Sequence, residues 1–470
     1  MLFAASECAP LAKVGGLADV VAALPAELRR RGHDVRVVMP RYRATKAAPA
    51  VRLGTLRVPM GPGSVAAAVF ETRLERGGVP VYLLACEELF DRDGIYGAVA
   101  RGYDDNARRF AFLSRATVVL DDVVAFRPHV VHAHDWPTAL VPVNMRLNGS
   151  AAASVLSIHN LAHQGSFGVE RAGELGFGRD AAQLLGVERD RHLNFLRGGI
   201  AAATRIATVS PRYAAEVMTV EGGAGLSETL SERRDAVSGI LNGIDDTLWD
   251  PATDPFLPAN YDASSLSGKA VCKRSLQREL GLTVRADAPL FGCIARFVDQ
   301  KGIDVLARAL PALLTLDVQL AVIGAGEPWA ERFFARLSAT TPNVRAFIGY
   351  DEGLAHRIEA GADFFLMPSR YEPCGLNQLY SQRYGTLPIV RAVGGLADSV
   401  EHGVTGFSFD ALTPEALVDA VGGALAVRRD RTRFAAMQRT AMNKRMGWAE
   451  AAPQYEALYR LALRDRPEGG

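Results

Sequence analysis

Short apolar runs that alternate with helical patterns constrain the fold of this chain more than any other feature. Most runs are continuous and lack the in–out alternation of a strand with one exposed face. The runs are LFAAS, VRVVM, VPVYLLA, VVHAH, SVLSIH and RIATVS, followed by LFGCIA, VQLAVIG, VRAFIG, FFLMPS and LPIVR. Helical patterns lie between them, for example over 17–31 and 303–316. This order predicts α/β domains of the doubly wound type, with parallel sheets buried on both faces.

The alternation is interrupted once, by a segment rich in Pro, Asp and Asn that begins at Asn242. A segment of this composition, without periodicity, is typical of a connection between domains. We therefore expect an N-terminal domain over 1–242, an interdomain connection over 243–268 and a second α/β domain over 269–445. A last helical pattern, within 446–470, could pack back on the N-terminal domain.

The two halves resemble each other. Each begins with a strand, a loop ending in a lysine, a glycine and a helix, and the hexapeptide VGGLAD occurs at 14–19 and again at 393–398. Loops that leave the carboxyl ends of parallel strands form the ligand crevice in doubly wound sheets. Two such domains facing each other would place Lys13, Lys301 and both Gly-Gly turns around a central cleft.

Composition excludes several classes of protein. The chain has 470 residues, enough for two or three domains, and a net charge of +1, which gives no reason to expect a nucleic acid partner. The five cysteines are scattered and never form CxxC, which disfavours a disulfide framework and a zinc site and fits the cytoplasm. No apolar stretch approaches the ~20 residues of a membrane span, and the N-terminus lacks a signal-peptide pattern.

Two cationic loops follow predicted strands. In KVGG the glycines allow backbone N–H groups to approach an anion, and Lys13 adds a full charge. A tight turn with a solvated lysine is the simpler interpretation of this motif taken alone. In ARFVDQKGID, Arg296 and Lys301 could grip a diphosphate, whose charge grows as it leaves. The alternative is a surface loop with solvated charges.

Polar residues also end two other strands. His159 follows SVLSI, where a hydrogen-bonded core histidine is the common alternative to a functional one, and Asp135 is a candidate acceptor for a sugar hydroxyl. His132 and His134 are two residues apart in one strand, and we expect them to point to opposite faces, which disfavours a metal site. The DRD sequence that begins at Asp91 could hold a divalent ion, but a solvated loop is the simpler interpretation.

The segment RYEPCG joins a strand to a helix and carries a carboxylate at the turn. Glu372 could be a helix cap, since free N–H groups stabilise a carboxylate there. It could also be an ionised group that faces developing positive charge. Pro373 fixes the turn, and Gly375 allows backbone to approach a ligand.

Together these stretches resemble the bacterial glycogen synthases, ADP-glucose-dependent glucosyltransferases that are also similar to plant starch synthases. The resemblance covers nearly the whole chain. The segments that carry it, in the family's order, are ASECAPLAKVGGLADVVAALP, HAHDWPTAL, SIHNLAHQG, VSPRYAAEV, GILNGIDDTLWDP, ARFVDQKGID and MPSRYEPCGLNQLYSQRYGTLPIVRAVGGLADSV.

The resemblance implies an α/β GT-B fold, with two Rossmann-like domains facing a central cleft. It implies a retaining transfer of glucose from ADP-glucose to the non-reducing end of an α-1,4-glucan, with no metal or other cofactor and no membrane partner. The oligomeric state is not predicted. The alternatives are another retaining GT-B glycosyltransferase with a different nucleotide sugar, and a catalytically silent glucan- or nucleotide-binding protein.

The resemblance also implies roles for individual residues. Glu372 resembles the carboxylate near the glucose, His159 the residue that supports the oxocarbenium-like state, and Arg296 with Lys301 the diphosphate clamp. The residues that resemble substrate contacts are Lys13, Gly15, Gly16, Asp19, Asp135, Asn160, Asn242, Tyr350, Cys374, Gly375 and Leu376. Tyr350 resembles the aromatic that stacks on adenine.

Three positions depart from the family or from its wider group. Val14 stands where the family usually has Thr or Ser, and Asn377 stands where many relatives have Thr. Tyr380 stands where a broader set of retaining GT-B enzymes carries a second Glu, and a tyrosine there is usual for the synthase branch.

Overall fold

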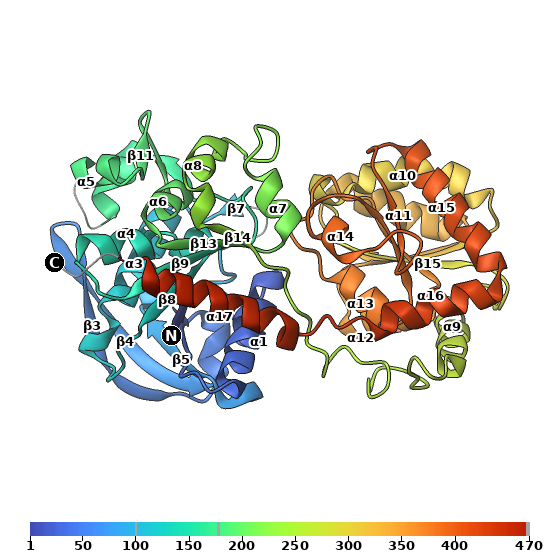
Figure 1. Ribbon diagram of the computed structural model, residues 1–470, viewed down its shortest axis with the longest axis horizontal. Helices are drawn as coiled ribbons and strands as arrows, with labels where there is room; N and C mark the ends of the chain where they lie inside the picture. The colour runs from blue at the N-terminus through green and yellow to red at the C-terminus, as the bar shows by residue number, and fades with distance from the viewer. Residues whose placement is uncertain (99–100, 176–178, 467–470) are drawn as a thin grey trace. The chain divides into compact units, whose positions relative to one another are not determined.

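A computed structural model describes residues 1–98, 101–175 and 179–466. The chain divides into two compact units (Figure 1). Unit 1 consists of Met1–Gly243 and Trp448–Gly470, and unit 2 consists of Ile244–Gly447. Most of the segment expected as an interdomain connection is therefore counted with unit 2, where Trp249 and Tyr261 are buried in a hydrophobic cluster.

Unit 1 contains a nine-stranded sheet in the order β14-β13-β9-β8-β1-β2-β5-β4-β3. Pairing is parallel from β14 to β5 and antiparallel through β4 and β3. The strands are β1 (Leu2–Ala4), β2 (Arg36–Pro40), β3 (Val51–Met60), β4 (Gly63–Arg73), β5 (Pro80–Ala85), β8 (Val130–His134), β9 (Ala153–Ile158), β13 (Arg205–Thr208) and β14 (Val237–Gly239).

Two small antiparallel sheets accompany the main sheet of unit 1. They are formed by β6 (Gly97–Ala98) with β7 (Arg101–Gly102), and by β10 (Ser166–Gly168), β12 (His192–Asn194) and β11 (Glu188–Arg189). The helices of unit 1 are α1 (Gly16–Arg30), α2 (Glu87–Phe90), α3 (Asn106–Val118), α4 (Leu140–Leu147), α5 (Arg179–Leu184), α6 (Phe195–Ala202), α7 (Pro211–Glu216), α8 (Ser227–Glu232) and α17 (Trp448–Arg464).

The C-terminal helix α17 packs in unit 1 against α1 and the strands β8, β9 and β13 (Figure 1). Trp448, Tyr455 and Tyr459 on this helix are buried. The Tyr459 hydroxyl lies 2.9 Å from Nδ1 of His132 in β8, so the last helix of the chain is tied to a central strand of the first unit.

Unit 2 contains a six-stranded sheet in the order β17-β16-β15-β18-β19-β20, with every pair parallel. The strands are β15 (Leu290–Ile294), β16 (Gln319–Gly324), β17 (Val344–Ile348), β18 (Phe364–Met367), β19 (Leu387–Arg391) and β20 (Phe407–Phe409). The helices are α9 (Ser267–Glu279), α10 (Ile303–Leu314), α11 (Pro328–Thr340), α12 (Glu352–Gly361), α13 (Asn377–Arg383), α14 (Gly394–Ser399), α15 (Pro414–Arg429) and α16 (Arg431–Asn443).

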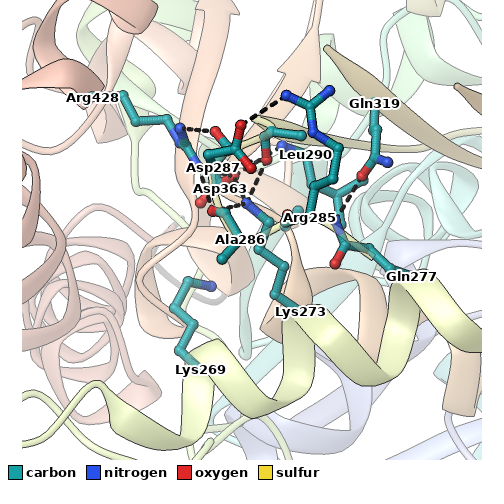
Figure 2. Close-up of polar contacts among 12 residues, drawn as sticks. Lys269, Lys273, Gln277, Arg285, Ala286, Asp287, Leu290, Gln319, Asp363 and Arg428 are labelled. Atoms are coloured by element: carbon teal, nitrogen blue, oxygen red, sulfur yellow. Dashed lines mark hydrogen bonds and ion pairs between the residues drawn. The ribbon is translucent and has the colours of Figure 1, made fainter. Parts of the chain in front are cut away.

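A buried charge cluster ties three elements of unit 2 together at the amino end of β18 (Figure 2). Asp363 accepts hydrogen bonds from Nζ of Lys273 on α9, at 2.7 Å, and from the backbone N–H of Leu290, at 2.8 Å. Arg428 on α15 forms an ion pair with the same carboxylate at 3.2 Å. Two cations thus surround one buried anion.

The predicted doubly wound α/β class is confirmed, and every predicted strand run contains an observed strand. No predicted run covers β3 and β4, the edge strands β14 and β20, or the short strands of the two small sheets. Within the described ranges, no helix combines the length and the apolarity needed to cross a bilayer.

In the main sheet of each unit the strand order reverses at the first strand, β1 in unit 1 and β15 in unit 2. From β1 the chain continues to β2 and β5 on one side and to β8, β9 and β13 on the other. From β15 it continues to β16 and β17 on one side and to β18, β19 and β20 on the other. Ligands of doubly wound proteins bind outside the carboxyl ends of the strands at this reversal. The loops after β1, β8, β15 and β18 are therefore the places to look for a site.

Candidate functional site

The predicted glycine loop of unit 1 lies between β1 and α1 and already holds an anion. The carboxylate of Glu7 accepts hydrogen bonds from the backbone N–H groups of Val14, at 2.6 Å, and Gly15, at 3.0 Å. Gly16 is exposed at the start of α1. Nζ of Lys13 lies 2.7 Å from the carboxylate of Asp19, so two of the predicted substrate contacts are ion-paired with each other.

Glu7 is a residue of this loop that the sequence reasoning missed. Its side chain is buried, and its second carboxylate oxygen accepts a hydrogen bond from the Tyr96 hydroxyl at 2.5 Å. The signal that pointed to Asp135, a carboxylate directly beyond a buried strand, was also present here. The Glu7 carboxylate stabilises the loop that carries Lys13 by accepting hydrogen bonds from the backbone N–H groups of that loop.

Asp135 ends β8 in a backbone conformation that L-residues rarely adopt, with φ 57° and ψ −176°. Its Oδ1 accepts hydrogen bonds from the N–H groups of His159, at 2.7 Å, and Asn160, at 3.4 Å. Burial raises the pKa of this carboxyl to about 7, although the two N–H groups oppose the shift. Strained backbone of this kind is concentrated at functional sites.

Histidines occupy the ends of β8 and β9. Nδ1 of His134 lies 3.0 Å from Nε2 of His159. Burial lowers the pKa of His159 to about 4 and that of His132 to about 3, and it lowers the pKa of His134 as well. All three imidazoles are therefore neutral near pH 7.

The expectation that His132 and His134 point to opposite faces was wrong. Their ring centroids are 4.1 Å apart, because residues two apart in a strand lie on the same face of the sheet. Nδ1 of His132 is hydrogen-bonded to the Tyr459 hydroxyl and Nε2 to the Ser157 hydroxyl, so both ring nitrogens of this histidine already have a protein partner.

Two further predicted contacts of unit 1 are asparagines. The Asn160 side chain accepts a hydrogen bond from the N–H of Ala162 at 3.1 Å, which stabilises the turn after β9. Asn242 is buried at the end of unit 1, and its Oδ1 accepts no hydrogen bond from the residues that the structure describes.

In unit 2 two predicted catalytic residues, which follow the neighbouring strands β15 and β18, form an ion pair. Nζ of Lys301, in the loop after β15, donates to Oε2 of Glu372, in the loop after β18, at 2.6 Å. The Ser369 hydroxyl donates to the same oxygen at 3.1 Å. Glu372 is only 4% exposed, so the ion pair is held in one arrangement.

Glu372 lies before the turn into α13 and is not the helix cap, because its carboxylate is bound by Lys301 and Ser369 and the helix begins at Asn377. Gly375 has φ 71°, a left-handed conformation that favours glycine, and Leu376 precedes the helix without a capping hydrogen bond from its side chain. Cys374 is buried. The Glu372 carbonyl accepts a hydrogen bond from the N–H of Gly395 at 3.0 Å, which connects this turn to the second VGGLAD segment.

Two predicted residues lie apart from the Lys301–Glu372 pair. Arg296 is exposed directly after β15, and its guanidinium has no hydrogen bond or ion pair with the described part of the chain. Tyr350 is 67% exposed in the loop after β17. Both remain at the carboxyl edge of the sheet that carries Lys301.

The departures from the family pattern have structural correlates. Val14 is exposed. The Asn377 side chain donates to the carbonyl of Ile294 at 2.7 Å and so links α13 to the end of β15. The Tyr380 ring stacks on Trp249 with centroids 3.9 Å apart, in a packed position.

The DRD loop is bound by basic side chains. Arg43 and Lys46 lie 3.1 and 2.8 Å from the carboxylate of Asp91, and Arg43 also pairs with Asp93 at 2.9 Å. Among residues 1–98, 101–175 and 179–466, no group of three His, Cys, Asp or Glu side chains has the arrangement of a metal site.

Two family models match the chain. The starch synthase catalytic domain matches residues 1–232, and the glycosyl transferases group 1 domain matches residues 281–440. The first covers the loops of Lys13, Asp135 and His159, and the second covers those of Lys301 and Glu372.

The similar proteins agree with these matches. Glycogen synthase 1 of Geobacter metallireducens is 48% identical, over 99% of this chain and 96% of the relative. A glycogen synthase of Anaeromyxobacter dehalogenans is 47% identical, over 98% of this chain and 99% of the relative.

Among solved structures, the catalytic domain of Starch Synthase IV from Arabidopsis thaliana, bound to ADP and acarbose, superposes with a TM-score of 0.90. It is 33% identical, and the match covers 98% of this chain and 99% of that one. The chain belongs to the bacterial glycogen synthase family, with an α/β GT-B fold of two Rossmann-like sheets.

Proposed function

We propose that the protein transfers glucose from ADP-glucose to the non-reducing end of an α-1,4-glucan, with retention of the anomeric configuration. The observation that carries the proposal is the Lys301–Glu372 ion pair, which lies beyond the carboxyl ends of β15 and β18, where the strand order of the unit 2 sheet reverses. A departing diphosphate gains negative charge while the glucosyl carbon becomes electron-poor. A cation and a buried carboxylate side by side match that separation of charge.

Individual roles follow from this arrangement. Lys301 and the exposed Arg296 bind the diphosphate, and Glu372 stabilises the cationic sugar. Lys301 serves both the diphosphate and Glu372, because its ammonium group pairs with the Glu372 carboxylate before the donor binds. Each such electrostatic contact is worth about 3 kcal/mol of barrier.

Unit 1 contributes the groups around the sugar. Asp135 holds the backbone of His159, and His159 supports the glucosyl group in the transition state. Lys13 supplies further positive charge near the donor.

The nucleotide contact is assigned to Tyr350, whose exposed ring can stack on a base. The plant starch synthase domain, which is similar to this chain over nearly its full length, is bound to ADP and acarbose. That likeness supports ADP-glucose as the donor and a glucan as the acceptor. The five free, buried cysteines fit a reducing compartment, and we place the protein in the cytoplasm.

Incubation of the purified protein with glycogen and labelled ADP-glucose or UDP-glucose tests the proposal. We expect label in the glucan from ADP-glucose, and release of that label by an enzyme that cleaves α-1,4 bonds from the non-reducing end. Faster incorporation from UDP-glucose would assign a different donor. Incorporation from neither donor would remove the enzymatic proposal.

A further inference from the structure

Two consecutive residues at the end of β8 hold His159, one through its backbone and one through its ring. Asp135 binds the His159 N–H at 2.7 Å, and Nδ1 of His134 lies 3.0 Å from Nε2 of the His159 imidazole. We propose that His134 is a positioning residue that fixes the ring and the tautomer of His159, so that Nδ1 of His159 carries the proton and its N–H donates a hydrogen bond to the bound glucosyl donor. The inference rests on the proposed function for its catalytic consequence.

His134 is suited to this role because it is immobile. Its side chain is fully buried. Its ring stacks on Phe3, with centroids 5.3 Å apart and planes 26° apart, and it packs on His132 with centroids 4.1 Å apart. The rings of Phe3 and His132 are themselves in contact, with centroids 4.8 Å apart, so His134 is one member of a packed cluster of three rings. This packing keeps the Nδ1 atom, and with it the His159 imidazole, in one orientation.

The hydrogen-bond pattern decides which nitrogen carries the proton. Nε2 of His134 is buried and has no hydrogen-bond partner among the described residues. If that nitrogen carried the proton, a buried N–H donor would be left unsatisfied, which is destabilising and rarer in proteins than an unused acceptor. The proton of His134 therefore belongs on Nδ1.

The protonation of His159 follows from that of His134. The Nδ1–H of His134 donates to Nε2 of His159, so Nε2 of His159 is an acceptor. A neutral imidazole carries a single proton, which must then be on Nδ1 of His159. Burial keeps both rings neutral near pH 7, which agrees with this assignment.

This assignment defines what His159 can do. The side chain offers a donor to a sugar hydroxyl or a phosphate oxygen, and it cannot accept a proton from the acceptor glucan at Nδ1. The remaining nitrogen is occupied by His134. His159 therefore stabilises negative or polar oxygen on the donor and is no general base.

Steady-state kinetics of two His134 variants test the positioning role. H134F keeps a ring that can pack against Phe3 and His132 but removes the hydrogen bond to His159. H134N places an amide nitrogen near the position of Nδ1 and can restore that bond. We expect kcat to fall by up to ~100-fold in H134F, with the KM for ADP-glucose nearly unchanged, and to recover in part in H134N.

The matched control is Y459F, which removes a buried hydrogen bond to His132 on the same face of the sheet and leaves the His134–His159 contact intact. Its kcat should stay within about twofold of wild type, although its melting temperature should fall because a buried hydrogen bond is lost. An H134F kcat equal to wild type, an H134N kcat no higher than that of H134F, or an equal loss in Y459F would each overturn the positioning role.

Nitrogen-15 NMR of the imidazole groups tests the tautomer without any turnover. H159Q identifies the His159 signals, and the wild-type spectrum should show a proton on Nδ1 and a bare Nε2 in His159. In H134F the His159 ring should become a mixture of tautomers. A wild-type His159 protonated at Nε2 would overturn the inference. Failure of glucan labelling would overturn the proposed function and leave this spectrum unaffected.

Discussion

At the scale of single residues, Asp135 combines backbone strain with a raised pKa. A carboxyl of pKa about 7 is partly protonated at neutral pH, whereas the same group in the unfolded chain is ionised above pH 4. The folded state therefore binds more protons between these values. The contribution of Asp135 to stability is complete below pH 4 and is lost as the pH rises through 7.

D135N should consequently change stability in a pH-dependent way. The asparagine keeps an oxygen acceptor for the His159 N–H but cannot ionise. At pH 8 we expect the free energy of unfolding of the variant to exceed that of wild type by roughly 1 to 4 kcal/mol, so that it unfolds at a higher denaturant concentration. At pH 4 the two proteins should have the same stability. Urea titrations at the two pH values check this, and an equal effect at both would show that ionisation is not the cause.

Single residues of the candidate site were predictable to different degrees. Asp135, His159, Lys301 and Glu372 each follow a buried strand, and that position is visible in the sequence. Their partnerships were not visible. Lys301 meets Glu372 only because β15 and β18 are neighbours in the sheet, a pairing of segments about 70 residues apart that no local pattern records.

His134 was missed for another reason. The strand VVHAH is predicted correctly, but residues two apart in a strand were expected on opposite faces of the sheet, whereas they share one face. Applied correctly, the two-residue period of a strand places His132 and His134 on one face and makes His134 a neighbour of the strand that ends before His159.

At the scale of elements, Gly302 sets the distance between two loops of the candidate site. It has φ 63°, and a Cβ there would lie 1.9 Å from the carbonyl oxygen of Pro368, which follows β18. The residue thus allows the Lys301 loop to lie directly on the strand that leads to Glu372. A side chain at this position must move one loop away from the other.

G302A should lower both stability and activity. We expect a loss of a few kcal/mol, because the strain at positive φ adds to the clash, and a kcat reduced by at least tenfold as Lys301 moves from Glu372. The control is G422A in α15, where nothing lies within 4 Å of the added carbon. It should raise stability by about 0.5–1 kcal/mol and leave kcat unchanged. Thermal melts and initial rates distinguish the two, and similar behaviour of both variants would refute the close-contact argument.

The Asp363 cluster of Figure 2 joins α9, β18 and α15. Burial opposes the ionisation of Asp363, but the charges of Lys273 and Arg428 together hold its pKa below the ordinary value. Its contribution to stability is thus present above pH 4 and is lost as the pH falls through the lowered pKa.

D363N should destabilise unit 2 strongly, because it leaves two buried cations without an anion. We expect a loss of about 3–5 kcal/mol at pH 7 that becomes smaller in acid. D287N, which removes an exposed partner of Arg285 in the same region, should cost below about 1 kcal/mol. Denaturant titrations of the two variants compare them directly, and a D363N loss no larger than that of D287N would contradict the cluster's role.

Elements were predictable where strands are buried on both faces. The parallel strands read as continuous apolar runs, and those runs were the signal used. The hairpin of β3 and β4 was missed because its strands are antiparallel at the sheet edge and alternate, with Leu56, Val58 and Met60 buried between exposed residues. A search for alternation would have found them.

At the scale of the whole molecule, the division into two units predicts which part of the chain ADP stabilises against unfolding. The residues proposed to contact ADP are Arg296, Lys301 and Tyr350, and all three lie in unit 2, so we expect ADP to stabilise that unit directly. At 100 times its Kd, the ligand should add ~2.7 kcal/mol. Calorimetry of the full chain should show the ADP-dependent increase in the transition that D363N lowers. A shift confined to the other transition would assign the nucleotide to unit 1.

The central claim is that a buried carboxylate beside Lys301 lowers the barrier to glucosyl transfer. The most direct test is the kcat for incorporation of labelled glucose from ADP-glucose into glycogen by E372Q, with E352Q on the exposed start of α12 as the matched control. The account predicts a kcat about 100- to 1000-fold below wild type for E372Q, with ADP binding retained, and an unchanged kcat for E352Q. An E372Q kcat within a few-fold of wild type would contradict it.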